Sequence, residues 1–394
     1  MLARDVVIVG AGPAGTATAL HLLKADPTLA GDILLLDKAV HPREKICAGG
    51  LIPHTLDCLH ELDIPLAVPH VQVDRAFVRV PPGREVFCED GGMCSIVRRD
   101  AFDFSLVQAA RARGAEIREG EKVLALIREP AGVRVVTDKE TYQARVVVGA
   151  DGSGSRVRRL LVGEDSSPIG KALMCDIPVA ETCWDGFLKQ RYDFNFTPVT
   201  QGLKGYLWAF PCLLNEVPHV NVGIYSLGNT RLSNADLQRL LAYDLARLKP
   251  QVSSPKFRAF PIYGYTPGRP LAAPHVVLVG DAAGAEPLMG EGISFALEYG
   301  KFAAQAILPT LRTRRWDFSE YSETLARSGL GKKLARLHMT ACMFYGSTSR
   351  FWFALAARSR RLQSVGLKWY NGVEGWHQRS GWEAVRAVLQ PRTG

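Results

Sequence analysis

The chain has 394 residues, of which 47% are hydrophobic and 22% are charged, and its formal net charge is +9. This composition is typical of a soluble globular protein with one large interleaved fold or about two or three domains, and it excludes a disordered or fibrous chain. No run of about 18 apolar residues is present, so the sequence predicts no membrane-spanning helix. The first strand begins almost directly after Met1 and leaves no room for a cleaved signal peptide, which predicts a cytoplasmic protein.

The positive charge is concentrated toward the C-terminus. Residues 300–394 contain 16 Lys and Arg but only 5 Asp and Glu, whereas residues 1–299 are nearly neutral. This asymmetry favours a local anionic ligand or surface, and we expect no nucleic-acid partner. The eight cysteines occur singly, without a Cys-x-x-Cys pair. They therefore predict reduced thiols, with neither a disulfide framework nor a metal site.

In chain order, the first informative stretch is Val-Val-Ile-Val-Gly-Ala-Gly-Pro-Ala-Gly at residues 6–15, where a buried parallel strand turns into a helix. Gly10 permits the tight turn, Gly12 lets the backbone approach a pyrophosphate, and Gly15 allows the helix to pack closely on the strand. The N–H groups at the helix N-terminus would face the anion. Asp37 ends the next apolar run 22 positions after Gly15, close to the spacing of a ribose-binding acid. These features predict a dinucleotide-binding βαβ unit.

A polar loop at residues 41–50 follows and becomes rich in glycine at its end. Loops at this position lie near the bound cofactor in such folds. Arg43 and Lys45 could meet a phosphate or a substrate anion, or they could be a solvated basic pair. Cys47 could lie against a ligand or be a small buried side chain.

The following segments predict short strands around Pro81-Pro82-Gly83, then an amphipathic helix over about residues 97–113. Three further strands precede a buried strand at residues 144–149. That strand ends in Asp151-Gly152, a turn at the carboxyl end of a parallel strand and therefore at a ligand-facing position.

Residues 170–265 carry alternating, aromatic-rich segments that predict a second, largely antiparallel sheet forming one wall of a substrate cavity. Within it the stretch Tyr206-Leu207-Trp208-Ala209-Phe210-Pro211 is dense in aromatic residues, for which local reasoning alone favours ordinary strand packing. The chain then returns to the first domain in a buried strand that runs into Gly280-Asp281. Gly290-Glu291-Gly292-Ile293 opens a helix whose first N–H groups could face an anion or an electron-rich ring.

The remaining tail is helical and basic, with aromatic residues set among arginines. The residues concerned are Phe344, Tyr345, Phe351, Trp352 and Phe353 among Arg336, Arg350, Arg358, Arg360 and Arg361. This mixture fits an interfacial helix on an anionic membrane, or a helix that covers a domain and keeps a solvated basic face.

Taken together, the first glycine turn, Arg99-x-x-Phe102-Asp103, Asp151-Gly152 and Gly280-Asp281 resemble the p-hydroxybenzoate hydroxylase-type FAD superfamily over about residues 4–310. The resemblance implies that Asp37, in place of the usual Glu, binds the adenosine ribose of FAD. It also implies that Arg99 reaches the pyrophosphate region, while Asp281 holds the ribityl chain or the pyrophosphate. Asp151-Gly152 would lie by the joining of the FAD and substrate domains. The full cofactor-binding set that it implies is Gly10, Gly12, Ala14, Gly15, Asp37, Lys38, Lys45, Cys47, Ala48, Gly49, Arg99, Val123, Asp151, Gly152, Gly280, Asp281, Gly290, Gly292 and Ile293.

We therefore expect an α/β fold in which a Rossmann-type FAD-binding domain is interleaved with an antiparallel-sheet substrate domain, followed by a helical C-terminal region. The expected FAD-binding domain is discontinuous and the tail forms a third region. The boundaries are 1–75, 96–165 and 270–310 for the FAD-binding domain, 76–95 and 166–269 for the substrate-binding domain, and 311–394 for the helical basic region.

Two stretches resemble the signatures of the geranylgeranyl reductase family, whose members saturate carbon–carbon double bonds of isoprenoid chains. They are Pro42-x-x-Lys45-x-Cys47-x-Gly49-Gly50 and Tyr206-x-Trp208-x-Phe210-Pro211, the second followed by Val222-Gly223. Such a reduction needs a hydride from the flavin and a proton, in a pocket that excludes water. Tyr206, Trp208 and Phe210 are the expected substrate wall. Trp208, Phe210 and Cys47 are the catalytic candidates, and Cys47 would orient or protonate the alkene.

Several alternatives stay open. A flavin halogenase would carry Gly-Trp-x-Trp-x-Ile-Pro, where this chain has Tyr206 and Phe210 at two of the diagnostic places. A flavin-dependent monooxygenase acting on an aromatic compound, or a prenyl-lipid carrier without catalysis, would use the same scaffold.

No second Gly-x-Gly-x-x-Gly is present, so the expected electron donor is NADPH bound transiently or a ferredoxin-like protein. The substrate is an isoprenoid or another apolar small molecule, and the basic tail could touch a membrane peripherally.

Overall fold

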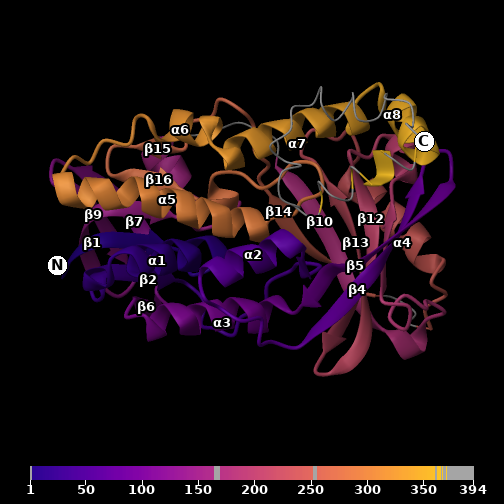
Figure 1. Cartoon of the computed structure of the whole chain (residues 1–394), viewed down its shortest axis with the longest axis horizontal. Helices are drawn as coiled ribbons and strands as arrows, with labels where there is room; N and C mark the ends of the chain where they lie inside the picture. Colours follow the sequence, from indigo (N-terminus) through magenta and orange to yellow (C-terminus); the bar gives the residue numbers. More distant parts are fainter. Residues whose placement is uncertain are drawn as a thin grey trace, which may run out of the picture.

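The computed structural model describes residues 2–163, 169–251, 255–359, 362–364, 366 and 370. Its described part contains two eight-stranded sheets that lie side by side along the long axis of the molecule, with helices packed around the first and across one side of both (Figure 1). The expected α/β fold, with a Rossmann-type unit interleaved with a mainly antiparallel sheet, is confirmed.

The first sheet is built around a parallel core in the order β16-β9-β1-β2-β6. Val6–Val9 in β1 and Ile33–Leu36 in β2 are buried, as expected for apolar strands that are covered on both faces. A short strand, β15, extends one edge and the hairpin β7–β8 branches from β9. The strands are β1 (Leu2–Val9), β2 (Ile33–Asp37), β6 (Glu116–Glu119), β7 (Val123–Glu129), β8 (Gly132–Thr137), β9 (Thr141–Gly149), β15 (Ala272–Ala273) and β16 (Val276–Leu278).

The second sheet has the order β14-β10-β13-β12-β11-β4-β5-β3. All neighbouring pairs are antiparallel except β4 and β11, which run parallel. Strand β4 enters this sheet at His70, before the expected boundary at residue 76; the division of the chain into domains stays a prediction. The strands are β3 (Gly50–Leu51), β4 (His70–Val80), β5 (Arg84–Val97), β10 (Gly170–Pro178), β11 (Arg191–Asn195), β12 (Gly205–Leu214), β13 (Val217–Ser226) and β14 (Arg258–Ile262).

Helix α1 packs between α3 and α5 beside the first sheet (Figure 1). Helix α4 packs on β13 of the second sheet and was not predicted from the sequence. Among the residues described, no helix combines the length and the apolar composition needed to cross a membrane. The main helices are α1 (Pro13–Ala25), α2 (Pro53–Glu61), α3 (Arg99–Ala112), α4 (Asn234–Ala246), α5 (Ile293–Thr313), α6 (Tyr321–Arg327), α7 (Gly329–Tyr345) and α8 (Ser349–Arg358).

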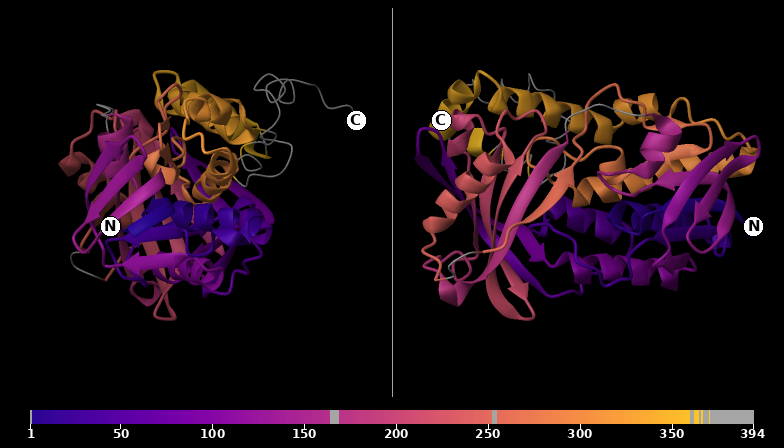
Figure 2. Two further views of the ribbon diagram at one scale, coloured as in Figure 1. Left: turned by 90° about the vertical axis from the view of Figure 1, so that its left-hand side faces the viewer. Right: turned by 180° about the vertical axis from the view of Figure 1, so that it is seen from behind.

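The tail helices α6, α7 and α8 run across one side of the molecule from the first sheet to the second (Figures 1 and 2). Tyr345 and Phe353 are buried, and the Phe353 ring lies 5.3 Å from that of Phe196 beside the second sheet. The expected helical C-terminal region is thus confirmed as far as residue 359, and its buried aromatic residues cover a sheet. Arg360, Arg361 and residues 371–394 of the expected basic region lie outside the described residues. Membrane contact through this tail stays a prediction.

Gly300 allows α5 to approach α1 closely. A Cβ atom at Gly300 would lie 2.7 Å from the Cβ of Ala17 and 2.7 Å from the backbone nitrogen of Thr18. Gly300→Ala should therefore lower the free energy of unfolding by about 1–3 kcal/mol, as measured by urea denaturation of the FAD-loaded protein. The control is Gly329→Ala at the start of α7, where an added Cβ meets no atom within 4 Å. Equal stability of the two variants would contradict this explanation.

Candidate functional site

The three glycines between β1 and α1 have separate structural roles. Gly10 has a φ of +109°, and a Cβ there would lie 2.3 Å from the carbonyl oxygen of Ala150. A Cβ at Gly15 would lie 1.9 Å from the carbonyl oxygen of Gly10, so Gly15 permits α1 to pack onto the turn. At Gly12 the nearest atom, 3.5 Å from such a Cβ, is the Nη2 of Arg43. Of the three glycines, only Gly12 leaves room on the ligand side of the turn.

The N-terminus of α1 suits an anion. Its N-cap residue, Gly12, provides no side-chain hydrogen bond, and Pro13 occupies the first helical position. The first backbone N–H groups of such a helix lack intrahelical partners and carry a partial positive charge. Arg43 adds a guanidinium beside the turn, where its Nη2 lies 3.2 Å from Oδ2 of Asp103. The turn can therefore hold a pyrophosphate.

Asp37 lies at the end of β2 and is 8% exposed. Its Oδ2 accepts a hydrogen bond from the N–H of Ala11 at 2.9 Å, and its Oδ1 accepts one from Ala39 at 2.9 Å. These bonds fix the carboxylate beside the glycine turn, while each oxygen retains a second lone pair for a ribose hydroxyl. The geometry agrees with the role implied for Asp37.

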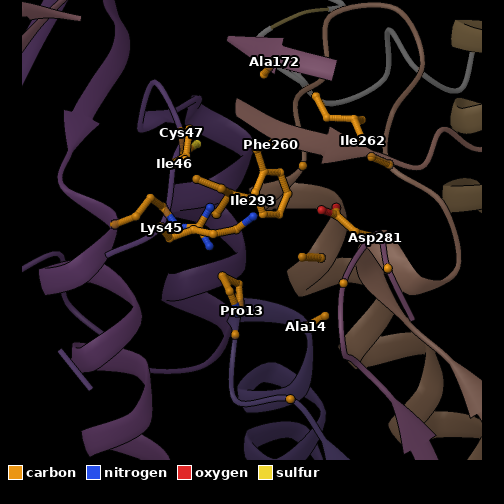
Figure 3. A pocket seen from close by; sticks show the side chains of 18 of the residues that line it. Pro13, Ala14, Lys45, Ile46, Cys47, Ala172, Phe260, Ile262, Asp281 and Ile293 are labelled. Atoms are coloured by element: carbon orange, nitrogen blue, oxygen red, sulfur yellow. The ribbon is translucent and has the colours of Figure 1, made fainter. Parts of the chain in front are cut away.

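A groove of about 710 Å³ runs from this turn to the second sheet. Figure 3 shows part of it, with Lys45, Asp281 and Ile293 converging on one space. The groove brings together most of the expected residues, namely Gly10, Gly12, Ala14, Asp37, Lys38, Lys45, Cys47, Ala48, Gly49, Arg99, Val123, Asp151, Gly152, Asp281, Gly290, Gly292 and Ile293, together with Tyr206, Trp208 and Phe210. The expected cofactor residues Gly15 and Gly280 do not line it. Both serve packing, because a Cβ at Gly280 would lie 2.7 Å from the Cβ of Ala14.

The carboxylates of Asp151 and Asp281 differ in the hydrogen bonds that they accept. Asp151 accepts hydrogen bonds from the Oγ of Ser155 at 2.5 Å and from the N–H of Arg156 at 2.6 Å, so it fixes the turn that follows β9. The side chain of Asp281 points into the groove (Figure 3) and accepts a longer hydrogen bond of 3.4 Å from the Oγ of Ser153. Asp281 is thus the acid better placed to contact a ligand.

The first N–H groups of α5 are bound by an acidic side chain of the same segment. Glu291 accepts hydrogen bonds from the N–H groups of Ile293 and Ser294, each at 3.0 Å, and from the Oγ of Ser294 at 2.6 Å. In this structure the chain itself provides the acceptor for these two N–H groups, and the expectation that the start of α5 faces a ligand stays a prediction. Gly292 and Ile293 nevertheless line the groove.

Lys45 extends across the groove toward Phe260 (Figure 3). Its Nζ lies 2.9 Å from the centroid of the Phe260 ring, and burial lowers the pKa of this amine to about 8. The side chain can therefore exchange a proton near neutral pH, as well as contribute positive charge close to Asp281.

Cys47 lies where the glycine-rich loop meets the second sheet. Its Sγ accepts a hydrogen bond of 3.4 Å from the N–H of Gly49 and also interacts electrostatically with the side chain of Arg99. Arg99 makes two hydrogen bonds to Asp103, of 2.7 and 3.0 Å. Arg99 lines the groove, but in this structure its guanidinium is held by Asp103.

The aromatic wall consists of Tyr206, Trp208 and Phe210 on β12, all buried and all lining the groove. The indole of Trp208 packs over Gly223 on β13, where a Cβ would lie 2.2 Å from the ring. Its Nε1 donates a hydrogen bond of 2.7 Å to Oδ1 of Asn221. Gly223 and Asn221 together fix the orientation of Trp208.

A polar network that the sequence reasoning missed connects this wall to the Cys47 loop. Asn221 donates a hydrogen bond of 2.6 Å to Oδ1 of Asp176, whose Oδ2 accepts one of 2.6 Å from Arg258. Arg258 also pairs with Glu44, directly before Lys45 in the loop. The only signal in the sequence was a polar residue within each of two apolar strands, β10 and β13.

A second cavity of about 900 Å³ adjoins the groove. Its walls are almost entirely apolar and come from β4, β5 and β11 on one side and from α7 and α8 on the other. Met289, Glu291 and Tyr370 line both spaces, so the two meet at these residues. The sequence predicted a substrate cavity against the second sheet but not that the tail helices form its other wall.

Residues 286–291 form the partition between groove and cavity. Glu286 is 1% exposed, and its carboxylate accepts the N–H groups of Leu288 and Met289. Burial raises the pKa of Glu286 to about 7. Three tyrosine hydroxyls donate to carbonyl groups of the same segment. They are those of Tyr206 to Met289, Tyr225 to Pro287 at 3.3 Å and Tyr345 to Leu288 at 2.7 Å.

Comparison with known proteins agrees with this geometry. The family of FAD binding domains matches residues 3–182. The menaquinone reductase of Mycobacterium tuberculosis is 30% identical, over 92% of this chain and 90% of its own length. The geranylgeranyl diphosphate reductase of Rhodobacter capsulatus is also 30% identical, over 84% and 80% of the two chains. These matches and the glycine turn define an FAD-dependent oxidoreductase, and FAD is its cofactor.

Solved structures show the same fold. A geranylgeranyl bacteriochlorophyll reductase-like protein from Thermoplasma acidophilum superposes with a TM-score of 0.76 at 21% identity, over 99% of this chain and 96% of its own. A flavin-dependent brominase superposes with a TM-score of 0.73 at 18% identity, over 98% of both chains. On the strength of its relatives, the chain belongs to the geranylgeranyl reductase family of FAD-dependent oxidoreductases.

The variants Gly12→Ala and Gly15→Ala should distinguish a glycine that leaves room for FAD from one that is needed for helix packing. We expect Gly12→Ala to change the stability of the apoprotein by no more than about 1 kcal/mol, because only Arg43 is near, while weakening FAD binding about 10- to 100-fold. Gly15→Ala should destabilise the apoprotein as well, since its Cβ would meet the Gly10 carbonyl. Urea denaturation of apoprotein and titration with FAD measure the two effects. Unchanged FAD affinity in Gly12→Ala would refute the assignment.

Glu286 should make stability depend on pH. The pKa of the Glu286 carboxyl group is raised from 4.5 to about 7, so the folded protein binds the carboxyl proton more tightly than the unfolded chain does. The free energy of unfolding therefore falls as the pH rises from about 4.5 to 7. The variant Glu286→Gln has no titratable carboxyl group at this position, so its stability does not fall in this way. We expect the free energy of unfolding of the variant, relative to the original chain, to rise by about 2–3 kcal/mol between pH 5 and pH 8. If the difference in free energy of unfolding between the two proteins did not change with pH, a raised pKa of Glu286 would be disproved.

Proposed function

We propose that this protein reduces carbon–carbon double bonds of a prenyl or other isoprenoid substrate. The observation that carries the proposal is the hydrocarbon-lined cavity of about 900 Å³ that meets the FAD groove at Met289, Glu291 and Tyr370. Ligand pockets of this size bury most of the surface of a small apolar molecule. An isoprenoid chain lying in this cavity would enter the groove at the junction.

The chain's own residues bind and shield such a substrate. Tyr192 and Phe194 from β11, with Phe196 directly after this strand, face aliphatic and aromatic side chains of α7 and α8 across the cavity. Burial of a flexible hydrocarbon against these side chains is favourable by about 25 cal/mol per Å² of apolar surface. The same side chains exclude water from the reacting double bond.

Reduction of the double bond requires a hydride and a proton, and reduced FAD supplies the hydride when bound. Cys47 is our candidate for the proton donor, since its Sγ lies in the groove beside the aromatic wall. The proton on Sγ would pass to one alkene carbon, and the positive charge of the nearby Arg99 guanidinium would stabilise the resulting thiolate. Trp208 and Phe210 would position the alkene.

The relatives add support from outside the geometry. Those described above carry the names of a menaquinone reductase and a geranylgeranyl diphosphate reductase. We also propose that the flavin is reduced by NADPH or by a ferredoxin-like protein. The basic tail would make a peripheral contact with a membrane.

A monooxygenase or a halogenase is the alternative, because a flavin-dependent brominase shares the fold. Tyr206 and Phe210 stand where halogenases carry Trp and Ile, which argues against halogenation. A carrier without catalysis is disfavoured by the intact glycine turn. Oxygen consumption coupled to an aromatic substrate would favour the monooxygenase.

Incubation of the dithionite-reduced protein with a panel of prenyl compounds tests the reaction. The panel should include a prenyl diphosphate, a prenyl quinone and a prenyl glycerolipid. We expect a mass gain of about 2 Da for each double bond reduced, detected by mass spectrometry. The control omits dithionite. A panel without any mass gain, despite bound FAD, would count against the reductase and favour the alternative.

Cys47→Ala and Cys47→Ser test the proposed proton donor. With FAD bound, both should lower the rate of double-bond reduction about 10²- to 10⁴-fold, as expected for loss of a general acid. Substrate affinity should change little. Cys183→Ser is the matched control, because Cys183 is exposed and does not line either cavity. Full turnover in both Cys47 variants would disprove this role.

A further inference from the structure

Lys333 on α7 is an unusual residue for the wall of the apolar cavity. It is 6% exposed, and its Nζ has no hydrogen-bond acceptor among the described residues. The ammonium lies 4.6 Å from the centroid of the Phe295 ring and 3.8 Å from Oε2 of Glu298, which is beyond hydrogen-bond distance. A buried ammonium without an acceptor is costly, and a ligand that supplies one would gain a charge-assisted hydrogen bond.

The charges near Lys333 determine what kind of acceptor fits. Lys333 is the one cation among the described residues that line the cavity, and the remaining charged residues there are the acids Glu286 and Glu291. Glu298 already balances the ammonium. A diphosphate would add several negative charges to this acid-rich, desolvated region, whereas a carbonyl oxygen would accept the hydrogen bond at no cost in charge.

We infer that Lys333 anchors the substrate by donating a hydrogen bond to an uncharged oxygen acceptor, such as a ring carbonyl, at the head of the prenyl chain. This inference rests on the proposed function and narrows its substrate class. It selects a prenyl compound with a neutral carbonyl head over a prenyl diphosphate.

The position of Lys333 also limits which double bond reacts. Phe295, against which the ammonium lies, is in the first turn of α5, and Ile293 in the same turn lines the FAD groove. The head group held by Lys333 therefore lies close to the junction of groove and cavity. A double bond near the head would be presented to the groove, while the distal chain would extend between β11 and the tail helices.

Binding to the oxidised, FAD-loaded protein tests this inference without turnover. The probes are a naphthoquinone with a short prenyl tail, the corresponding prenylnaphthalene without carbonyl oxygens, and geranylgeranyl diphosphate, with dissociation constants measured by quenching of tryptophan fluorescence. We expect the quinone to bind about 10- to 100-fold more tightly than the naphthalene, as for a hydrogen bond to a charged donor. Lys333→Met should abolish this preference and leave binding of the naphthalene unchanged.

Lys333→Met removes the cation beside Oε2 of Glu298, whose Oε1 pairs with His54. If this single variant fails to fold, the double variant Lys333→Met/Glu298→Gln, which removes both charges, is used in its place. Equal loss of affinity for quinone and naphthalene would overturn the inference, since it would show a structural role. Tightest binding of the diphosphate, lost in the double variant, would also overturn it. A preserved, Lys333-dependent preference would refute the proposed function alone if the dithionite-reduced protein, incubated with the same probes, reduces no prenyl double bond of any probe.

Discussion

The partition formed by residues 286–291 fixes the relation between the FAD groove and the apolar cavity. Its carbonyl groups accept hydrogen bonds from tyrosines on β12, β13 and α7, and its N–H groups are bound by the buried Glu286. These bonds join the Rossmann-type unit, the second sheet and the tail at one point. Since buried backbone groups are costly to leave unpaired, displacement of any of these elements would expose several of them at once. The two spaces can therefore meet at a constant position.

The residues expected to bind the cofactor could be predicted from the sequence because they follow from local backbone chemistry. The spacing of the glycines predicted a turn between β1 and α1, because Gly10 needs a positive φ, Gly15 needs the absence of a Cβ, and Gly12 leaves room for a ligand. Asp37 at the end of β2 followed from the same unit. The helix α4 was readable as well, since Ser233 and Asp236 form a capping box at its start, but the aromatic pattern around it drew attention to strands alone.

The substrate side depends on contacts between residues far apart in the chain, which no local pattern reveals. Asp176 meets Arg258 and Asn221 only because β10 lies between β13 and β14. Strand β4 pairs in parallel with β11 across more than a hundred intervening residues. Lys333 looked like one basic residue of a basic tail, and its burial follows from the packing of α7 against α5. Tertiary packing, and not propensity, determines these features.

The origin of the cavity walls bears on how such enzymes diverge. The FAD-binding family match spans residues 3–182, whereas α7 and α8, which close the cavity, lie far beyond it. Under the proposed function, substitutions in these two helices would alter the length and the head group of the accepted molecule and leave the FAD-binding residues in place. Natural selection could thus vary substrate choice in one segment while inheriting the redox chemistry intact. Under the same proposal, exchange of α7 and α8 between relatives would exchange their substrate preference.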